Sequence, residues 1–99
     1  MKQITLICAG GFSTSMLVAS MEEAAKNQGL EVVVRAASES RFVEYENETD
    51  ILLLGPQVGF LVDDFKAKYA GKAMKVAVID SMDYGMMNGE KVLKDALTM

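Results

Sequence analysis

Four short apolar runs alternate with stretches whose apolar residues recur at helical spacing, and this alternation constrains the fold more than any other feature. The runs lie at 4–7, 31–36, 50–54 and 75–79. Strands that alternate with helices predict a parallel sheet with helices on both faces. The sequence therefore predicts a single α/β domain over residues 1–99, with an open four-stranded parallel sheet in a three-layer α/β/α arrangement.

The first helical stretch follows the run at 4–7. Leu17 and Met21 share one face with Ala24 or Ala25, as expected for a helix that buries one side. Gly29 is a typical C-terminal stop for this helix.

The remaining connections are less regular. Ser38 is expected to cap a short helix that carries an aromatic residue. Residues 57–69 predict one helix that ends at Gly71, residues 80–89 predict a loop, and residues 90–97 predict a last helix.

Charge and composition exclude several classes of function. With 14 acidic and 10 basic residues, the net charge of −4 does not suit a groove for nucleic-acid phosphates. The chain has no histidine, and its one cysteine is Cys8, so Cys-His catalysis, an intramolecular disulfide and a multi-cysteine metal site are all excluded within it. No apolar run reaches the roughly 18 to 20 residues that span a bilayer, and we expect no signal peptide.

Ligands of open α/β sheets bind beyond the carboxyl ends of the strands. The sequence places three segments there: 8–15, 55–57 and 80–85. The first is the most informative, because two glycines allow close approach of the backbone to a ligand and three hydroxyl residues can cap the next helix or bind an anion. The same environment favours a thiolate at Cys8, which could accept a phosphoryl group. The predicted phosphate cradle comprises Ala9, Gly10, Gly11, Phe12, Ser13, Thr14 and Ser15.

The pattern Cys8-x-x-Gly11-x-Ser13-Thr14-Ser15 resembles the phosphorylation loop of enzyme IIB of the phosphoenolpyruvate-dependent sugar phosphotransferase system, in its lactose/cellobiose (chitobiose) type. Residues 53–57 look like that family's segment after the third strand. Residues 78–81, followed by 84–85, look like its segment after the fourth strand. The resemblance covers essentially the whole chain.

The resemblance implies a cysteine phosphocarrier. A phosphohistidine of the IIA partner would pass its phosphoryl group to Cys8, which would pass it to a sugar bound to the membrane transporter IIC. It also implies a cytoplasmic protein at the inner face of the membrane, with no metal or organic cofactor. Ala9 stands where serine is frequent in the family, and Phe12 stands where methionine is common.

Three further residues are expected near the loop. Gln57 could hydrogen-bond the phosphate, and Tyr84 could line the same opening. Asp80 or Asp83 could serve as the general acid of a phosphatase, although a turn or cap residue is the plainer interpretation. The methionines at 82, 86 and 87 suit an adaptable docking surface.

Two other functions remain open on the residues alone. Low-molecular-weight phosphatases have a similar fold and loop, but their loop places an arginine six positions after the cysteine, where this chain has Thr14. The two arginines, Arg35 and Arg41, lie outside the loop. A flavodoxin-like module would instead hold a flavin phosphate in the loop without covalent chemistry.

Overall fold

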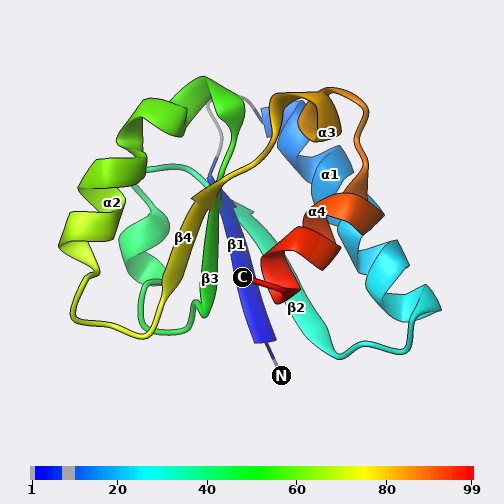
Figure 1. Ribbon diagram of the computed structural model, residues 1–99, viewed down its shortest axis with the longest axis horizontal. Helices are drawn as coiled ribbons and strands as arrows, with labels where there is room; N and C mark the ends of the chain where they lie inside the picture. Colours follow the sequence, from blue (N-terminus) through cyan, green and yellow to red (C-terminus); the bar gives the residue numbers. More distant parts are fainter. Residues whose placement is uncertain (1, 8–10) are drawn as a thin grey trace.

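The computed structural model describes residues 2–7 and 11–99, and side chains in the first helix from Ser15 onward. Four parallel strands form one sheet in the order β2-β1-β3-β4. They are β1 (Lys2–Ile7), β2 (Val32–Ala37), β3 (Ile51–Leu54) and β4 (Lys75–Val78). The predicted four-stranded parallel α/β sheet is confirmed (Figure 1).

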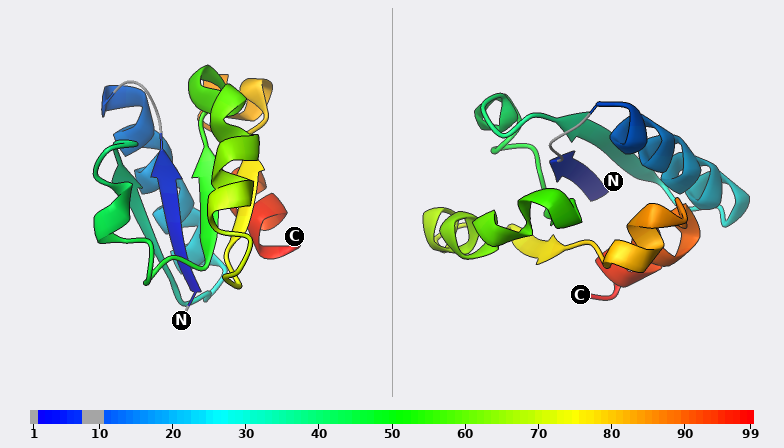
Figure 2. Two further views of the ribbon diagram at one scale, coloured as in Figure 1. Left: turned by 90° about the vertical axis from the view of Figure 1, so that its left-hand side faces the viewer. Right: turned by 90° about the horizontal axis from the view of Figure 1, so that it is seen from above.

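Helices cover both faces of this sheet, as expected (Figures 1 and 2). One face carries α1 (Gly11–Asn27), α3 (Ser81–Gly85) and α4 (Gly89–Leu97). The other face carries two 3₁₀ helices, η1 (Phe42–Glu44) and η2 (Pro56–Leu61), together with α2 (Val62–Lys68).

Successive side chains of the central strands β1 and β3 point to opposite faces of the sheet, which divides the core into two parts. Leu53 points to the α1 side and Leu54 to the α2 side, and both are buried. All four residues of β3 are buried, which fits a strand covered on both faces. On the α1 side, the predicted helix face is confirmed: Leu17, Met21 and Ala25 pack into the core.

Aromatic rings fill the core on the α2 side. Phe42 packs edge-on against Phe65 and Tyr69, with ring centroids 6.1 and 5.7 Å away. These contacts hold η1 against α2. The prediction that Ser38 caps this short helix is wrong. Arg41 occupies the cap position instead, without a side-chain cap bond, because the short turn forms as 3₁₀ three residues later than Ser38 predicts.

The prediction of one helix over 57–69 is wrong in its first half. Val58 leaves helical geometry at φ −117° and ψ 19°, so a 3₁₀ segment precedes the α-helix. The helix ends at Lys68, one residue before the end of the predicted range 57–69, and Tyr69 is its C-cap.

The predicted loop at 80–89 is wrong as well, because it contains α3. Asp80 caps this helix: its Oδ1 accepts hydrogen bonds from the backbone N–H groups of Met82 (2.9 Å) and Asp83 (3.2 Å). Helix α1 begins at Gly11, which puts Ser13, Thr14 and Ser15 within the helix rather than at its cap. Gly29 ends α1 in a left-handed conformation (φ 68°), as predicted.

No helix in the described ranges 2–7 and 11–99 is long and apolar enough to cross a membrane.

Candidate functional site

The topology creates a switch point at the carboxyl ends of β1 and β3. The chain leaves β1 toward β2 on one side through α1, and leaves β3 toward β4 on the other side through η2 and α2. Open α/β sheets bind ligands at such points. Both connections begin at this edge, which Figure 1 shows at the upper end of the sheet.

Backbone hydrogen bonds align the three strand ends that were predicted to meet. The Gly55 N–H donates to the Ile7 carbonyl at 2.8 Å, and the Ile79 N–H donates to the Leu54 carbonyl at 2.8 Å. The segments after β1, β3 and β4 therefore leave the sheet from one edge. Figure 2 shows the same grouping from two further directions.

The segment that the sequence singles out begins directly after Ile7. Cys8, Ala9 and Gly10 lie outside the described residues. The side chains of Gly11, Phe12, Ser13 and Thr14 also lie outside the description, while the backbone of α1 is described from Gly11. The predicted roles of these residues therefore stay predictions.

Helix α1 gives this edge a favourable electrostatic character for an anion. It is 17 residues long, starts three residues after Cys8 in the sequence, and has no acidic residue in its first turn. A helix N-terminus carries a partial positive charge that stabilises anions. Ser15, in this part of α1, is exposed.

The three expected neighbours of the loop differ in their surroundings. Gln57 is exposed on η2, two residues after Gly55. Asp80 lies after β4, and its carboxylate serves as the cap of α3. Tyr84 is only 6% exposed and packs in the core with α1 and α4. The expectation that its ring lines an open surface is therefore wrong.

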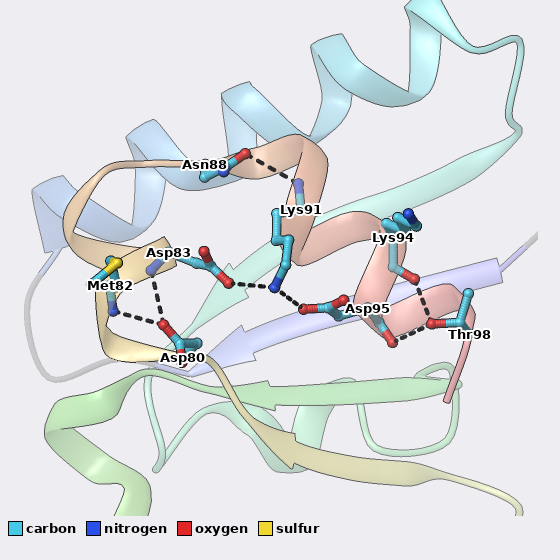
Figure 3. Close-up of polar contacts among 8 residues, drawn as sticks. All are labelled: Asp80, Met82, Asp83, Asn88, Lys91, Lys94, Asp95 and Thr98. Carbon is cyan, nitrogen blue, oxygen red and sulfur yellow. Dashed lines mark hydrogen bonds and ion pairs between the residues drawn. The ribbon is translucent and has the colours of Figure 1, made fainter.

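Lys91 links α3 to α4 and was not anticipated. Its Nζ donates to Asp83 Oδ2 at 3.1 Å and to Asp95 Oδ2 at 2.9 Å (Figure 3). These hydrogen bonds, first to Asp95 and then to Asp83, raise the pKa of Lys91. The Asp83 and Lys91 positions are eight residues apart and fall on different helices, so no helical spacing rule would have found the contact.

Both arginines have partners outside the three predicted segments 8–15, 55–57 and 80–85. Arg35 Nη2 donates to Gln3 Oε1 at 2.7 Å, and its guanidinium lies over the Tyr45 ring, 5.1 Å from the centroid. Arg41 Nε donates to Glu44 Oε2 at 3.2 Å. Both guanidinium groups therefore have partners outside the predicted loop.

A groove of about 800 Å³ opens beside Ile7 on the α2 side of the sheet. Its base is apolar and its rim carries charged and hydroxyl groups. The lining residues are Ile7, Ser38, Glu39, Ser40, Phe42, Val43, Val58, Leu61, Asp64, Phe65, Lys68 and Tyr69.

Comparison with known proteins identifies the family. Residues 3–95 match the family described as "PTS system, Lactose/Cellobiose specific IIB subunit". The chain belongs to this family. The predicted resemblance is thereby confirmed.

Two relatives agree with this assignment, and a solved structure agrees with the fold. The oligo-beta-mannoside-specific EIIB component of Bacillus subtilis is 37% identical over 100% of this chain and 96% of its own length. The cellobiose-specific EIIB component of Lactococcus lactis is 43% identical over 96% of this chain and 93% of its own length. The lactose-specific IIB domain of Streptococcus pneumoniae has the same fold, with a TM-score of 0.88, 18% identity, and coverage of 98% of this chain and 95% of that one.

Proposed function

We propose that this IIB protein is a phosphocarrier in which Cys8 receives a phosphoryl group from a phosphohistidine of the IIA protein. Cys8 then passes the group to a sugar bound to the membrane transporter IIC, which couples phosphorylation to uptake. The chain acts as one domain at the cytoplasmic face of the membrane. The observation that carries the proposal is the position of the one cysteine in the sequence, between the end of central strand β1 and the start of α1.

Two displacements at phosphorus make up the proposed reaction. In the first, the Cys8 thiolate attacks the phosphorus, a P–S bond forms, the P–N bond to the donor imidazole breaks, and the imidazole takes up a proton. In the second, a sugar hydroxyl attacks, a P–O bond forms, the P–S bond breaks, and the hydroxyl proton leaves to a base. The Cys8 thiolate is regenerated, so no net change remains on the carrier.

Charge stabilisation is the main task of the protein in this scheme. The N-terminus of α1 favours the thiolate over the thiol before transfer and the phosphoryl dianion after it. The predicted cradle, from Ala9 to Ser15, would bind the phosphoryl oxygens, with Gln57 as a further donor at the end of β3. A loop without arginine is poorly equipped to drive attack by water, which suits a carrier that must preserve its thiophosphate.

The proposed sugar is a β-glycoside. Lactose, cellobiose and oligo-β-mannosides, the sugars named for the family and its relatives, all contain β linkages. Because IIC binds the sugar in this scheme, its exact identity is a property of the partner.

The test is the intact mass of the protein after incubation with phosphoenolpyruvate, the general phosphotransferase proteins and phosphorylated IIA. We expect the wild type to gain one phosphoryl group and Cys8→Ser to gain none. Equal labelling of Cys8→Ser would show that another residue is the acceptor. No labelling of the wild type with any of several IIA proteins would refute the carrier function.

Asp80→Asn separates the carrier from the phosphatase alternative. The amide oxygen of asparagine can still cap α3, but the side chain can no longer act as an acid. We expect this variant to accept the phosphoryl group as the wild type does, and neither protein to turn over p-nitrophenyl phosphate. Steady turnover that Asp80→Asn abolishes would favour a phosphatase, and a yellow colour after purification would favour the flavin-binding alternative.

A further inference from the structure

Exposed apolar side chains gather at the same edge of the sheet as the candidate site. Phe60 on η2 is 78% exposed, Met82 on α3 is 70% exposed, and Met86 at the C-cap of α3 is 72% exposed. Val78, the last residue of β4, is 41% exposed. We call these four residues the apolar edge surface.

The apolar edge surface spans neighbouring elements. A Cβ atom placed on Gly59 would lie 3.2 Å from Cγ1 of Val78, so η2 packs directly against the end of β4. Helix α3 starts three residues after Val78. Figures 1 and 2 both show η2 and α3 at the end of the molecule where α1 begins.

Hydrogen bonds hold α3, and with it Met82 and Met86, in place on the rest of the fold. Asp80 caps its start, and Lys91 ties Asp83 to α4 (Figure 3). Beyond its end, the Met87 carbonyl accepts a hydrogen bond from the Ser20 hydroxyl at 3.1 Å. Met87 itself is half-buried against the core, so the expectation of three exposed methionines holds only for Met82 and Met86.

The charges of three stretches at this edge are unfavourable for an acidic partner. The described stretches 11–21, 55–65 and 76–90 contain no lysine or arginine. They do contain the acidic residues Asp63, Asp64, Asp80, Asp83 and Glu90. Lys91, the first base after α3 along the chain, is already paired with two aspartates. An acidic partner surface would find no free base in these stretches and would meet like charges.

We propose that the apolar edge surface docks the protein phosphoryl donor, and that burial of apolar area rather than ion pairing drives this association. The inference rests on the proposed phosphocarrier function, because a donor atom can reach Cys8 only if the donor covers the edge where β1 ends. The donor surface that fits here is apolar and not acidic. Methionine suits such a contact because its flexible side chain adapts to a partner that must also leave.

The test is the kinetics of phosphoryl transfer from the phosphorylated IIA protein to the wild type, Phe60→Ser and the Met82→Ser/Met86→Ser double variant. We expect the double variant to raise KM about tenfold, as the loss of part of the buried apolar area predicts, with kcat within about twofold. Met82→Leu should keep the wild-type KM because leucine preserves the apolar area. Far-ultraviolet circular dichroism checks that each variant is folded.

Met99→Ser and Leu30→Ser are the matched controls. Both residues are exposed and apolar, but Leu30 follows α1 and the carbonyl of Met99 accepts a hydrogen bond from Lys75 at the start of β4. Both controls should leave KM unchanged. An unchanged KM in the double variant, or an equal rise in the controls, would overturn the docking surface while leaving the carrier function intact.

Salt tests the driving force separately. Ion pairs at a surface weaken as salt screens them, whereas apolar burial does not. We expect the wild-type KM to change less than about twofold between roughly 0.05 and 0.5 M potassium chloride. A several-fold rise in KM would overturn the apolar driving force. Absence of transfer to the wild type at every salt concentration would instead refute the carrier function itself.

Discussion

Tyr69 shows how the fold changes the chemistry of a single residue. Its ring is buried against Phe42 and Phe65, and its hydroxyl donates to Glu46 Oε2 at 2.7 Å. Burial, followed by this hydrogen bond and the Glu46 charge, raises the pKa of Tyr69 to about 12. The hydroxyl thus joins the segment after η1 to the end of α2.

The raised pKa of Tyr69 predicts a loss of stability in alkali. Between the unfolded pKa of about 10 and the folded pKa of about 12, the folded state holds more protons, so the free energy of unfolding falls as pH rises. The raised pKa contributes about 2 to 3 kcal/mol to the free energy of unfolding. This contribution is fully present below pH 10 and is lost as pH rises to about 12. Urea unfolding of the wild type and Tyr69→Phe across this pH range measures it. The variant should show a shallower alkaline decline.

Glu46→Gln refines this prediction, because it removes the charge and keeps a hydrogen-bond acceptor. Since burial is the larger cause of the shift, the Tyr69 pKa should fall only part of the way toward 10 in this variant. Ultraviolet difference absorbance of the phenolate reports that pKa. A Tyr69 that titrates near 10 in the wild type would contradict the account.

At the scale of elements, α1 and α4 meet at a point where only glycine fits. The Gly89 N–H donates to Ser20 Oγ at 3.1 Å, and the same hydroxyl donates to the Met87 carbonyl. A Cβ on Gly89 would lie 2.4 Å from Ser20 Oγ and 2.5 Å from the Met21 nitrogen. Some of the atoms that this Cβ would clash with belong to the backbone of α1, which cannot move away as a flexible side chain could.

Gly89→Ala should therefore lower the free energy of unfolding by about 2 to 3 kcal/mol, because overpacking forces α1 and α4 apart. Gly71→Ala is the control, since a Cβ there meets no atom within 4 Å, and it should change stability by no more than about 0.5 kcal/mol. Urea unfolding measures both. If the two variants had equal free energies of unfolding, α1 and α4 would accommodate the added methyl group without loss of stability, and the prediction would be wrong.

The elements also show where sequence patterns reach their limit. Periodicity located α1 because Leu17, Met21 and Ala25 repeat over several turns. It missed α3, a five-residue helix too short to show a period, although Asp80 is a good cap residue. The Ser20–Gly89 contact joins residues 69 positions apart, and no local pattern carries that information.

At the scale of the whole molecule, two cores share one sheet. Leu53 belongs to the core under α1 and α4, while its neighbour Leu54 belongs to the core under α2. A hydrogen bond of 2.8 Å between the buried hydroxyls of Thr5 and Thr49 further ties β1 to the segment before β3. The two cores therefore depend on the same central strands.

This arrangement predicts cooperative unfolding. Leu53→Ala and Leu54→Ala should each lower the free energy of unfolding by about 2 to 5 kcal/mol, and each should leave a single transition. Circular dichroism and tyrosine fluorescence should give coincident curves, since Tyr84 and Tyr69 report from opposite faces. An early transition in Leu54→Ala, seen by one probe alone, would mean that the α2 face unfolds by itself.

The global architecture was the most predictable property, because four apolar runs and their helical connections leave few arrangements of a parallel sheet. The alignment of the three strand ends followed from that topology. The burial of Tyr84 did not, since a tyrosine six residues after the end of a strand can face either the solvent or the core. Its neighbours in α1 and α4 decide the outcome, and they lie far away in the sequence.

The parallel arrangement also separates the ends of the chain from the candidate site. Lys2 opens β1 at the amino edge of the sheet, and the carbonyl of Met99 lies beside Lys75 at the same edge. The strands run from there to the opposite edge, where Cys8 follows β1 in the sequence. A linker attached to either terminus would emerge away from the apolar edge surface, so this fold can be joined to a second protein module, at either end, without screening the proposed phosphoryl acceptor.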